Sequence, residues 1–120
     1  MAGGKAQNAY PLRVVSKVVR YEAGSPVRLV ISVPKRLFKK AVHRNLLKRR
    51  IREAFRLNRA ELTEILEKQH KTVHVLVVFT GKEAATFDLI QSKIILILQR
   101  LKGIHAQDSL NSDGRPADLL

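Results

Sequence analysis

The sequence predicts an α+β domain, with a small mixed sheet that carries its helices on one face and a β-β-α-β-α order. Two valine-rich segments, residues 11–20 and 27–33, come first and are typical of strands. A long helical pattern follows, then the nearly all-apolar segment 73–80 and a second amphipathic helix. Because a strand, a helix and a strand succeed one another over residues 27–80, we expect a βαβ crossover that makes one parallel pair.

The first two strands are separated by residues 21–26, which include the turn-forming residues Gly24 and Pro26. The simplest way to join these strands is an antiparallel hairpin. Pro34 ends the second strand, since proline cannot donate to the ladder of hydrogen bonds.

The helical pattern is predicted to run from about residue 37 to about residue 58, and residues 60–69 extend or restart it. Thr86 is a suitable N-cap for a final helix over residues 87–102. The apolar residues of that helix recur at helical spacing: Phe87, Ile90, Ile94, Ile97, Leu98 and Leu101. Gly103 is a natural stop for the helix.

The length of 120 residues and the hydrophobic fraction of 45% correspond to one domain with one modest core. We place this domain at residues 10–103. Residues 1–9 are small and polar, and we interpret them as a loose lead-in. Residues 104–120 contain the run Asn-Ser-Asp-Gly-Arg-Pro, and we interpret them as a disordered tail.

Composition excludes several classes of function. The chain has no cysteine, which removes disulfides, thiolate zinc sites and cysteine nucleophiles. No apolar run is long enough to span a bilayer, so we expect no membrane partner. The N-terminus has no apolar stretch of signal-peptide type, and we expect a cytoplasmic protein. The four histidines and the carboxylates show neither metal-ligand spacing nor a catalytic constellation, so we expect no metal, no cofactor and no catalytic residue on the polypeptide.

The charge is strongly positive and concentrated. Lys and Arg total 23 against 10 Asp and Glu, which gives a net charge of +13. Residues 35–59 hold 11 of those cations and a single acid, Glu53. A block this dense repels itself, and that cost is easiest to explain if a polyanion normally lies on it.

On a helical wheel, residues 44–59 divide into two adjoining faces. Leu47, Ile51, Ala54 and Phe55 form an apolar stripe suited to the core. The other face, which we call the basic strip, consists of Arg44, Asn45, Lys48, Arg49, Arg52, Arg56 and Arg59. Its arginines outnumber lysine five to one, and guanidinium groups fork onto phosphate oxygens. Two alternatives to a nucleic-acid surface are an ordinary solvated face and a surface for anionic membranes.

The residues in and before the strip resemble a known family. Ser-Val-Pro-Lys-Arg at residues 32–36, followed by Ala-Val-His-Arg-Asn-Leu-Leu-Lys-Arg-Arg-Ile-Arg at residues 41–52, is similar to the signature of the bacterial ribonuclease P protein component. The family pattern is a Lys, then Ala-Val-x-Arg-Asn-x-x-Lys-Arg-x-x-Arg, and every fixed position of it is present. A weaker resemblance covers residues 10–102.

The resemblance implies a subunit that binds a large catalytic RNA and helps it remove the 5′ leader of precursor tRNA. The RNA would carry out the chemistry with magnesium bound in the RNA-containing holoenzyme, and no obligate protein partner is implied. It also implies a left-handed βαβ crossover, against the usual rule. The RNA-contacting set that it implies is Lys35, Arg36, Lys40, Arg44, Asn45, Lys48, Arg49 and Arg52, to which the basic strip adds Arg56.

Two expectations concern the leader. Tyr10, at the start of the first predicted strand, is the best candidate to stack on a single-stranded nucleotide, although an ordinary edge tyrosine is an equal alternative. The family builds one wall of its leader cleft from an N-terminal helix with aromatic residues, and residues 1–9 show no such pattern. We therefore expect that wall to be incomplete. A general RNA-binding or ribosome-associated protein without a cleavage role remains the alternative function.

Overall fold

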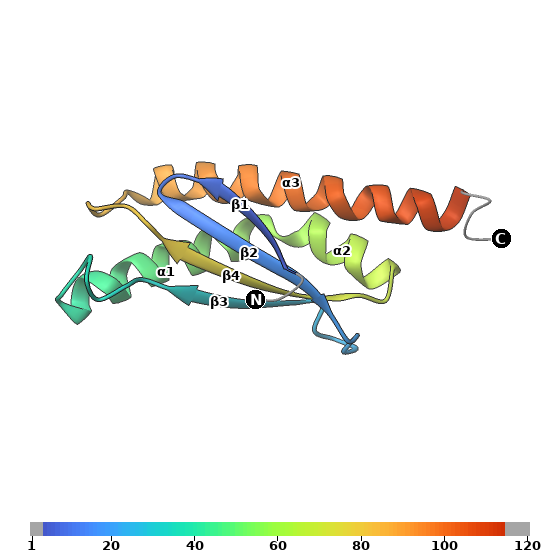
Figure 1. Ribbon diagram of the computed structural model, residues 1–120, viewed down its shortest axis with the longest axis horizontal. Helices are drawn as coiled ribbons and strands as arrows, with labels where there is room; N and C mark the ends of the chain where they lie inside the picture. Colours follow the sequence, from blue (N-terminus) through green and yellow to red (C-terminus); the bar gives the residue numbers. More distant parts are fainter. Residues whose placement is uncertain (1–3, 115–120) are drawn as a thin grey trace.

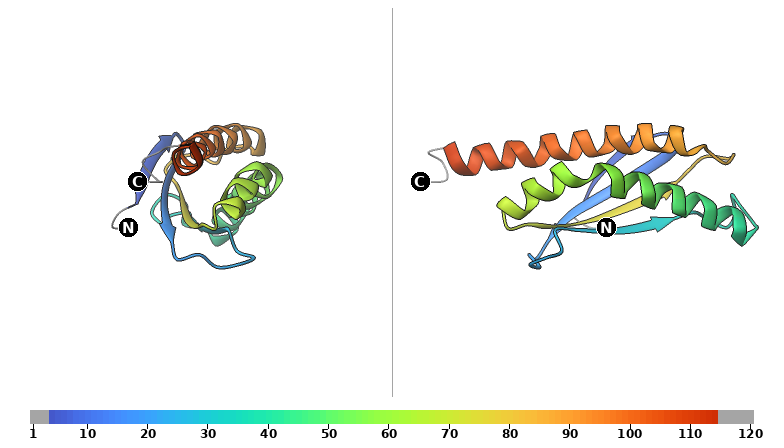
Figure 2. Two further views of the ribbon diagram at one scale, coloured as in Figure 1. Left: turned by 90° about the vertical axis from the view of Figure 1, so that its right-hand side faces the viewer. Right: turned by 180° about the vertical axis from the view of Figure 1, so that it is seen from behind.

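The computed structural model of the chain, which describes residues 4–114, contains one four-stranded sheet and three helices. The elements are β1 (Lys5–Ala9), β2 (Leu12–Val19), β3 (Val27–Ser32), α1 (Ala41–Asn58), α2 (Ala60–Lys68), β4 (Thr72–Phe79) and α3 (Phe87–Gly114). The strand order is β1-β2-β4-β3, and β3 and β4 are parallel. All three helices cover one face of the sheet, as Figures 1 and 2 show. The predicted fold class and the parallel pair are confirmed.

The connection from β3 to β4 makes a left-handed crossover. Both strands point to the left in Figure 1, β4 lies above β3, and the connecting helices α1 and α2 pass behind the sheet. The view from behind in Figure 2 gives the same hand. Such crossovers are right-handed in nearly all proteins, so this connection is diagnostic of a small set of folds. It agrees with the expectation drawn from the family resemblance.

The predicted hairpin between the first two valine-rich strands is wrong. β2 and β3 do not pair with each other, because β4 lies between them, antiparallel to β2 and parallel to β3. The physical reason is the composition of β4. Its run of apolar residues suits a central strand with neighbours on both sides. A hairpin of β2 with β3 would instead have left β4 at an edge of the sheet.

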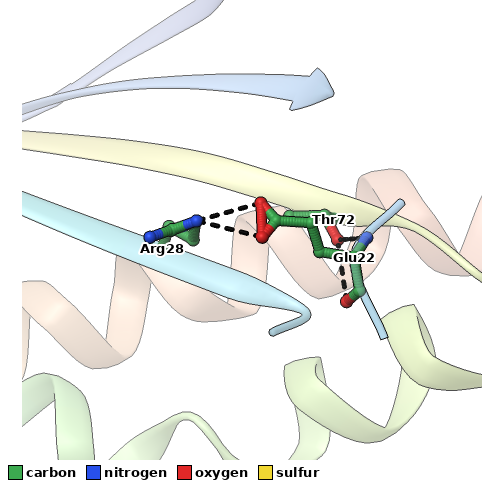
Figure 3. Close-up of polar contacts among 3 residues, drawn as sticks. All are labelled: Glu22, Arg28 and Thr72. Atoms are coloured by element: carbon green, nitrogen blue, oxygen red, sulfur yellow. Dashed lines mark hydrogen bonds and ion pairs between the residues drawn. The ribbon is translucent and has the colours of Figure 1, made fainter. Parts of the chain in front are cut away.

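The connection between β2 and β3 passes the beginning of β4 and is held there by hydrogen bonds (Figure 3). The backbone N–H of Glu22 donates to Thr72 Oγ1 at 2.8 Å, and Val73 N–H donates to the Pro26 carbonyl at 2.8 Å. The Glu22 carboxylate also accepts from Arg28 at 2.9 Å and 3.0 Å. Fully buried Thr72 thus ties the connection to the beginning of β4.

The interpretation of residues 1–9 as a loose lead-in is wrong for residues 5–9, which form edge strand β1 paired antiparallel with β2. Residues 1–3 lie outside the described residues. Polar contacts to α3 support this strand. Arg100 donates to the Asn8 carbonyl at 3.0 Å, and the Gln7 side chain donates to the Ile97 carbonyl at 3.5 Å. Only Ala9 of β1 is buried, so the strand lacks the apolar pattern that would have predicted it.

The final helix begins as predicted but continues beyond the predicted stop. Thr86 Oγ1 accepts from the N–H of Leu89 at 3.2 Å, which confirms the N-cap. The helix continues through Gly103 to Gly114, so the disordered tail is wrong for residues 104–114, and residues 115–120 lie outside the described residues. His105, 4% exposed, extends the apolar stripe four residues past Leu101, and its carbonyl accepts from Gln69 at 2.6 Å.

Candidate nucleic-acid interface

Helix α1 divides its surface as its sequence predicts. Leu47, Ile51, Ala54 and Phe55 are buried in the core between the sheet and the helices. Every member of the basic strip lies at the surface, with Arg44 and Lys48 half-buried and the others exposed. The division into a core stripe and a basic strip is confirmed, whereas RNA contact by the strip stays a prediction.

Arg44 differs from the rest of the strip because its guanidinium already has partners. It donates to the carbonyl of Phe38 at 2.8 Å and to the carbonyl of Lys39 at 2.9 Å. These carbonyls belong to the loop that precedes α1. Arg44 therefore acts on the shape of this loop in addition to adding charge.

The loop before α1 carries the remaining predicted contacts: Lys35, Arg36 and Lys40. The predicted helix start at residue 37 is wrong, since α1 begins at Ala41. The Pro34 carbonyl accepts from the N–H groups of both Leu37 and Phe38, which closes a turn. The Phe38 ring then packs edge-to-face on the Phe79 ring, with the ring centroids 5.6 Å apart.

This loop geometry keeps Phe38 out of the helix and leaves Lys35 and Arg36 as exposed cations in the segment that precedes α1. Lys40 is also exposed, and its carbonyl accepts from the N–H groups of His43 and Arg44 in the first turn. All three predicted loop cations are therefore exposed in the segment that leads into α1.

Most cations of the basic strip are uncompensated. Among residues 4–106, whose side chains the structure describes, Lys48, Arg49 and Arg52 form no ion pair or side-chain hydrogen bond with another residue. Three uncompensated charges within five residues of one helix produce a strong positive potential. Such a surface is available for anions without first breaking a protein contact.

Arg56 is compensated by the single acid of the region. Its guanidinium meets both carboxylate oxygens of Glu53 at 2.8 Å. The hydrogen bond from Arg56 holds the pKa of Glu53 below its usual value, and the same bond raises the pKa of Arg56. Both side chains are exposed, so this pair adds little to stability. Its main effect is to reduce the positive charge at one end of the strip.

The sheet face opposite the helices forms a second candidate surface. Strand alternation and register place Val15, Leu76 and Val30 side by side on this face. The neighbouring row contains Lys17, His74 and Arg28, and Arg13 lies on the other side of the apolar row. An apolar centre between cations suits an unpaired nucleic-acid strand, whose bases and phosphates need both.

Sequence reasoning did not single out this sheet surface. One signal was available, because Arg13 and Lys17 alternate with buried residues along β2. The contribution of β4 and β3 could not be seen, since it depends on β4 lying between the other strands.

Tyr10 lies apart from the basic strip. It is 67% exposed on the turn between β1 and β2, where it lines a hollow of about 370 Å³ together with Lys82 and Leu89. An exposed ring beside a lysine is compatible with base stacking. The structure thus supports two separate regions, the strip with its loop and the sheet with Tyr10.

The described residues show no group of three or more His, Asp or Glu side chains able to hold a metal ion. Within the same residues, no helix combines the length and apolar character needed to cross a bilayer.

The fold and the basic helix define the class of protein: a small α+β nucleic-acid-binding domain with a left-handed βαβ crossover. The sequence profile of the ribonuclease P family matches residues 4–102. The chain therefore belongs to the ribonuclease P protein family, whose members are subunits of an endonuclease that acts in tRNA processing.

Individual relatives support the same family assignment. The ribonuclease P protein component of Porphyromonas gingivalis is 30% identical over 110 residues, which cover 92% of this chain and 80% of that protein. The ribonuclease P protein of Thermotoga maritima is 26% identical, with a TM-score of 0.63 over 82% of this chain and 84% of that one. The ribonuclease P protein of Staphylococcus aureus is also 26% identical, with a TM-score of 0.58 over 81% and 80%.

Proposed function

We propose that this chain binds the catalytic RNA of ribonuclease P through the basic strip and the loop before α1. The contacting residues are Lys35, Arg36, Lys40, Arg44, Asn45, Lys48, Arg49, Arg52 and Arg56. The observation that carries the proposal is the row of uncompensated cations Lys48, Arg49 and Arg52 beside a fully buried apolar stripe. Phosphates of a folded RNA would supply the missing counter-charge.

We further propose that the subunit contacts the 5′ leader of precursor tRNA and so assists its endonucleolytic removal. The outer sheet face offers an apolar row between cations, and Tyr10 offers an exposed ring at one end of the same sheet. A single-stranded leader would stack its bases on the apolar side chains and direct its phosphates to Arg13 and Lys17.

In this proposal the RNA carries the chemistry, and magnesium is bound in the RNA-containing holoenzyme. The protein binds no cofactor of its own and needs no further protein partner. The proposal includes a cytoplasmic location, where precursor tRNA and the catalytic RNA would both be present.

The test is reconstitution. The purified chain is added to the ribonuclease P RNA of the same genome, and cleavage of precursor tRNA is measured at low magnesium. We expect the chain to restore cleavage and the double variant Arg49→Ala/Arg52→Ala to fail although it folds. Lys5→Ala, which removes a charge from exposed β1, serves as the control. RNA binding without restored cleavage would instead favour a general RNA-binding or ribosome-associated role.

A further inference from the structure

The outer edge of β3 is open. No strand of the described chain lies beyond it in the sheet. The Pro26 carbonyl points toward β4, because it accepts from Val73 N–H at 2.8 Å. Since backbone groups alternate sides along a strand, the N–H and C=O groups of Val27, Leu29 and Ile31 point away from β4. Edge groups of this kind are ready to pair with another molecule.

Arginines of α1 and of its junction with α2 lie beside this open edge. A hollow of about 300 Å³ lies between β3 and the helix, lined by Leu29, Arg52, Phe55, Arg56 and Arg59. Leu29 and Phe55 provide an apolar floor, while three guanidinium groups surround it. Of these, Arg56 is paired with Glu53, whereas Arg52 and Arg59 have no ion-pair partner among the described side chains.

Further along the edge, a second hollow is lined by an acidic residue as well as by an arginine. This adjoining hollow of about 320 Å³ shares Arg59 and extends to Gly24, Pro26 and Glu67. The Glu67 carboxylate makes that end unfavourable for an anion. A bound polyanion would therefore follow the groove from the basic strip as far as Arg59 and leave it there.

We infer that this edge groove, between β3 and α1, holds one unstacked nucleotide of the RNA. Arg52 and Arg59 bind its flanking phosphates, Leu29 supports the base or ribose, and the Leu29 N–H donates a hydrogen bond. The inference rests on the proposed function and adds to it a site with a backbone donor and with Arg59. A peptide strand on this edge would bury guanidinium groups without an anion, which is costly. RNA brings the anion with it.

The first experiment compares Arg59→Ala, Arg59→Lys and the control Lys5→Ala on the opposite edge strand. Affinity for ribonuclease P RNA is measured over a series of salt concentrations. Arg59→Ala should weaken binding about tenfold, the usual size for a charge-assisted hydrogen bond. It should also reduce the slope of log affinity against log salt by roughly 0.7–0.9, the value for one phosphate. Arg59→Lys should keep the slope and lose part of the affinity, and Lys5→Ala should change neither.

The second experiment measures amide hydrogen exchange, resolved to single residues, with and without the RNA. The Leu29 amide should become protected on binding, whereas the Arg28 and Val30 amides, which face β4, should change little. Either unchanged Leu29 exchange or unchanged affinity in Arg59→Ala would overturn the inference. Protection of Leu29 that depends on protein concentration without RNA would also overturn it, because the edge would then pair with a second copy or a peptide.

A further variant separates the two proposals. Arg49 lies on the basic strip but lines neither hollow. If Arg49→Ala weakens RNA binding while the Arg59 variants do not, the proposed function stands and the edge groove fails. If Arg49→Ala has no effect either, RNA binding by the strip itself is refuted.

Discussion

The guanidinium of Arg44 donates to the backbone carbonyl of Phe38 at 2.8 Å, six residues back in the sequence. A cation of the basic strip therefore closes the loop that carries three other predicted RNA contacts, Lys35, Arg36 and Lys40. In this family signature Arg50 also has a structural partner, because its guanidinium donates to the Ala85 carbonyl at 2.6 Å. Lys48, Arg49 and Arg52 have no such partner among the described side chains. Arg44 is thus a positioning residue for the loop as well as a charge.

The first prediction compares the stability effect of Arg44, which holds the loop, with that of Arg49, which does not. Arg44→Ala should lower the free energy of unfolding by about 1 kcal/mol, because it leaves two partly exposed carbonyls without their donor. Arg49→Ala should change it by less than about 0.5 kcal/mol, since Arg49 is exposed and forms no ion pair or side-chain hydrogen bond with another described residue. Chemical denaturation measures both, and equal effects would contradict the assignment.

The second prediction concerns the one acid of the region. Glu53→Gln removes the negative charge that Arg56 now neutralises, so RNA binding should become tighter by about twofold to threefold, or roughly 0.5 kcal/mol. The gain should shrink as salt rises, because both groups are exposed. Filter binding at two salt concentrations measures it. Weaker binding by the variant would mean that Glu53 itself contacts the RNA.

Two glycines make a matched pair for the third prediction. A Cβ on Gly81 would lie 2.9 Å from Pro11 Cβ and 3.0 Å from the Phe79 ring, so Gly81→Ala should destabilise by about 1–3 kcal/mol. Gly103, within α3, has open space around it, and Gly103→Ala should stabilise by about 0.5–1 kcal/mol. Thermal melting of both variants gives the test. A destabilised Gly103→Ala would mean that α3 does not continue past residue 103.

The fourth prediction uses the link between α2 and α3. Lys102 Nζ donates to Glu61 at 2.8 Å, and this hydrogen bond lowers the pKa of Glu61 below 4.5. A lowered folded-state pKa gives stability that is present above the unfolded pKa and is lost as the pH falls through the folded value. The stability curves of the parent and Glu61→Gln should therefore differ at about pH 6 and converge toward about pH 3. Curves that stay parallel would show that the pair does not contribute.

The fifth prediction concerns Tyr10 and the leader. Tyr10→Ala should reduce the preference of the holoenzyme for precursor over mature tRNA, because mature tRNA has no leader to stack on the ring. A loss of about 1–3 kcal/mol is the usual value for one stacked base. Affinity measured across a series of leader lengths is the readout. Identical loss for precursor and mature tRNA would place Tyr10 outside the leader path.

The features predicted correctly from the sequence are those that depend on residues within a single segment. The apolar stripe of α1, the N-cap at Thr86 and the buried apolar strand at residues 73–80 follow from patterns within one segment, and all were found. The left-handed crossover could be expected only through the family resemblance, because general packing rules favour the other hand.

The predictions that failed concern segments supported by residues far away in the sequence. β1 pairs with β2 and is supported by Arg100 and the Ile97 carbonyl of α3. Beyond Gly103, α3 is supported by the buried His105, whose carbonyl accepts from Gln69. The edge groove likewise joins residues of β3 and α1 that only the fold brings together. None of these contacts leaves a periodic signal in the sequence, so the sequence could not reveal them.

The position of β4 in the middle of the sheet has a consequence for synthesis on the ribosome. The two strands that flank β4, β2 and β3, leave the exit tunnel before it, and β4 follows only after α1 and α2. Until residue 79 has emerged, the nascent chain holds the β1–β2 hairpin and an unpaired β3, with no complete sheet on which the helices can pack. The sheet is therefore completed late in translation, when its central strand β4 pairs with β2 and β3. The dense positive charge of α1 emerges before that closure, and repulsion between like-charged chains opposes their association at this stage.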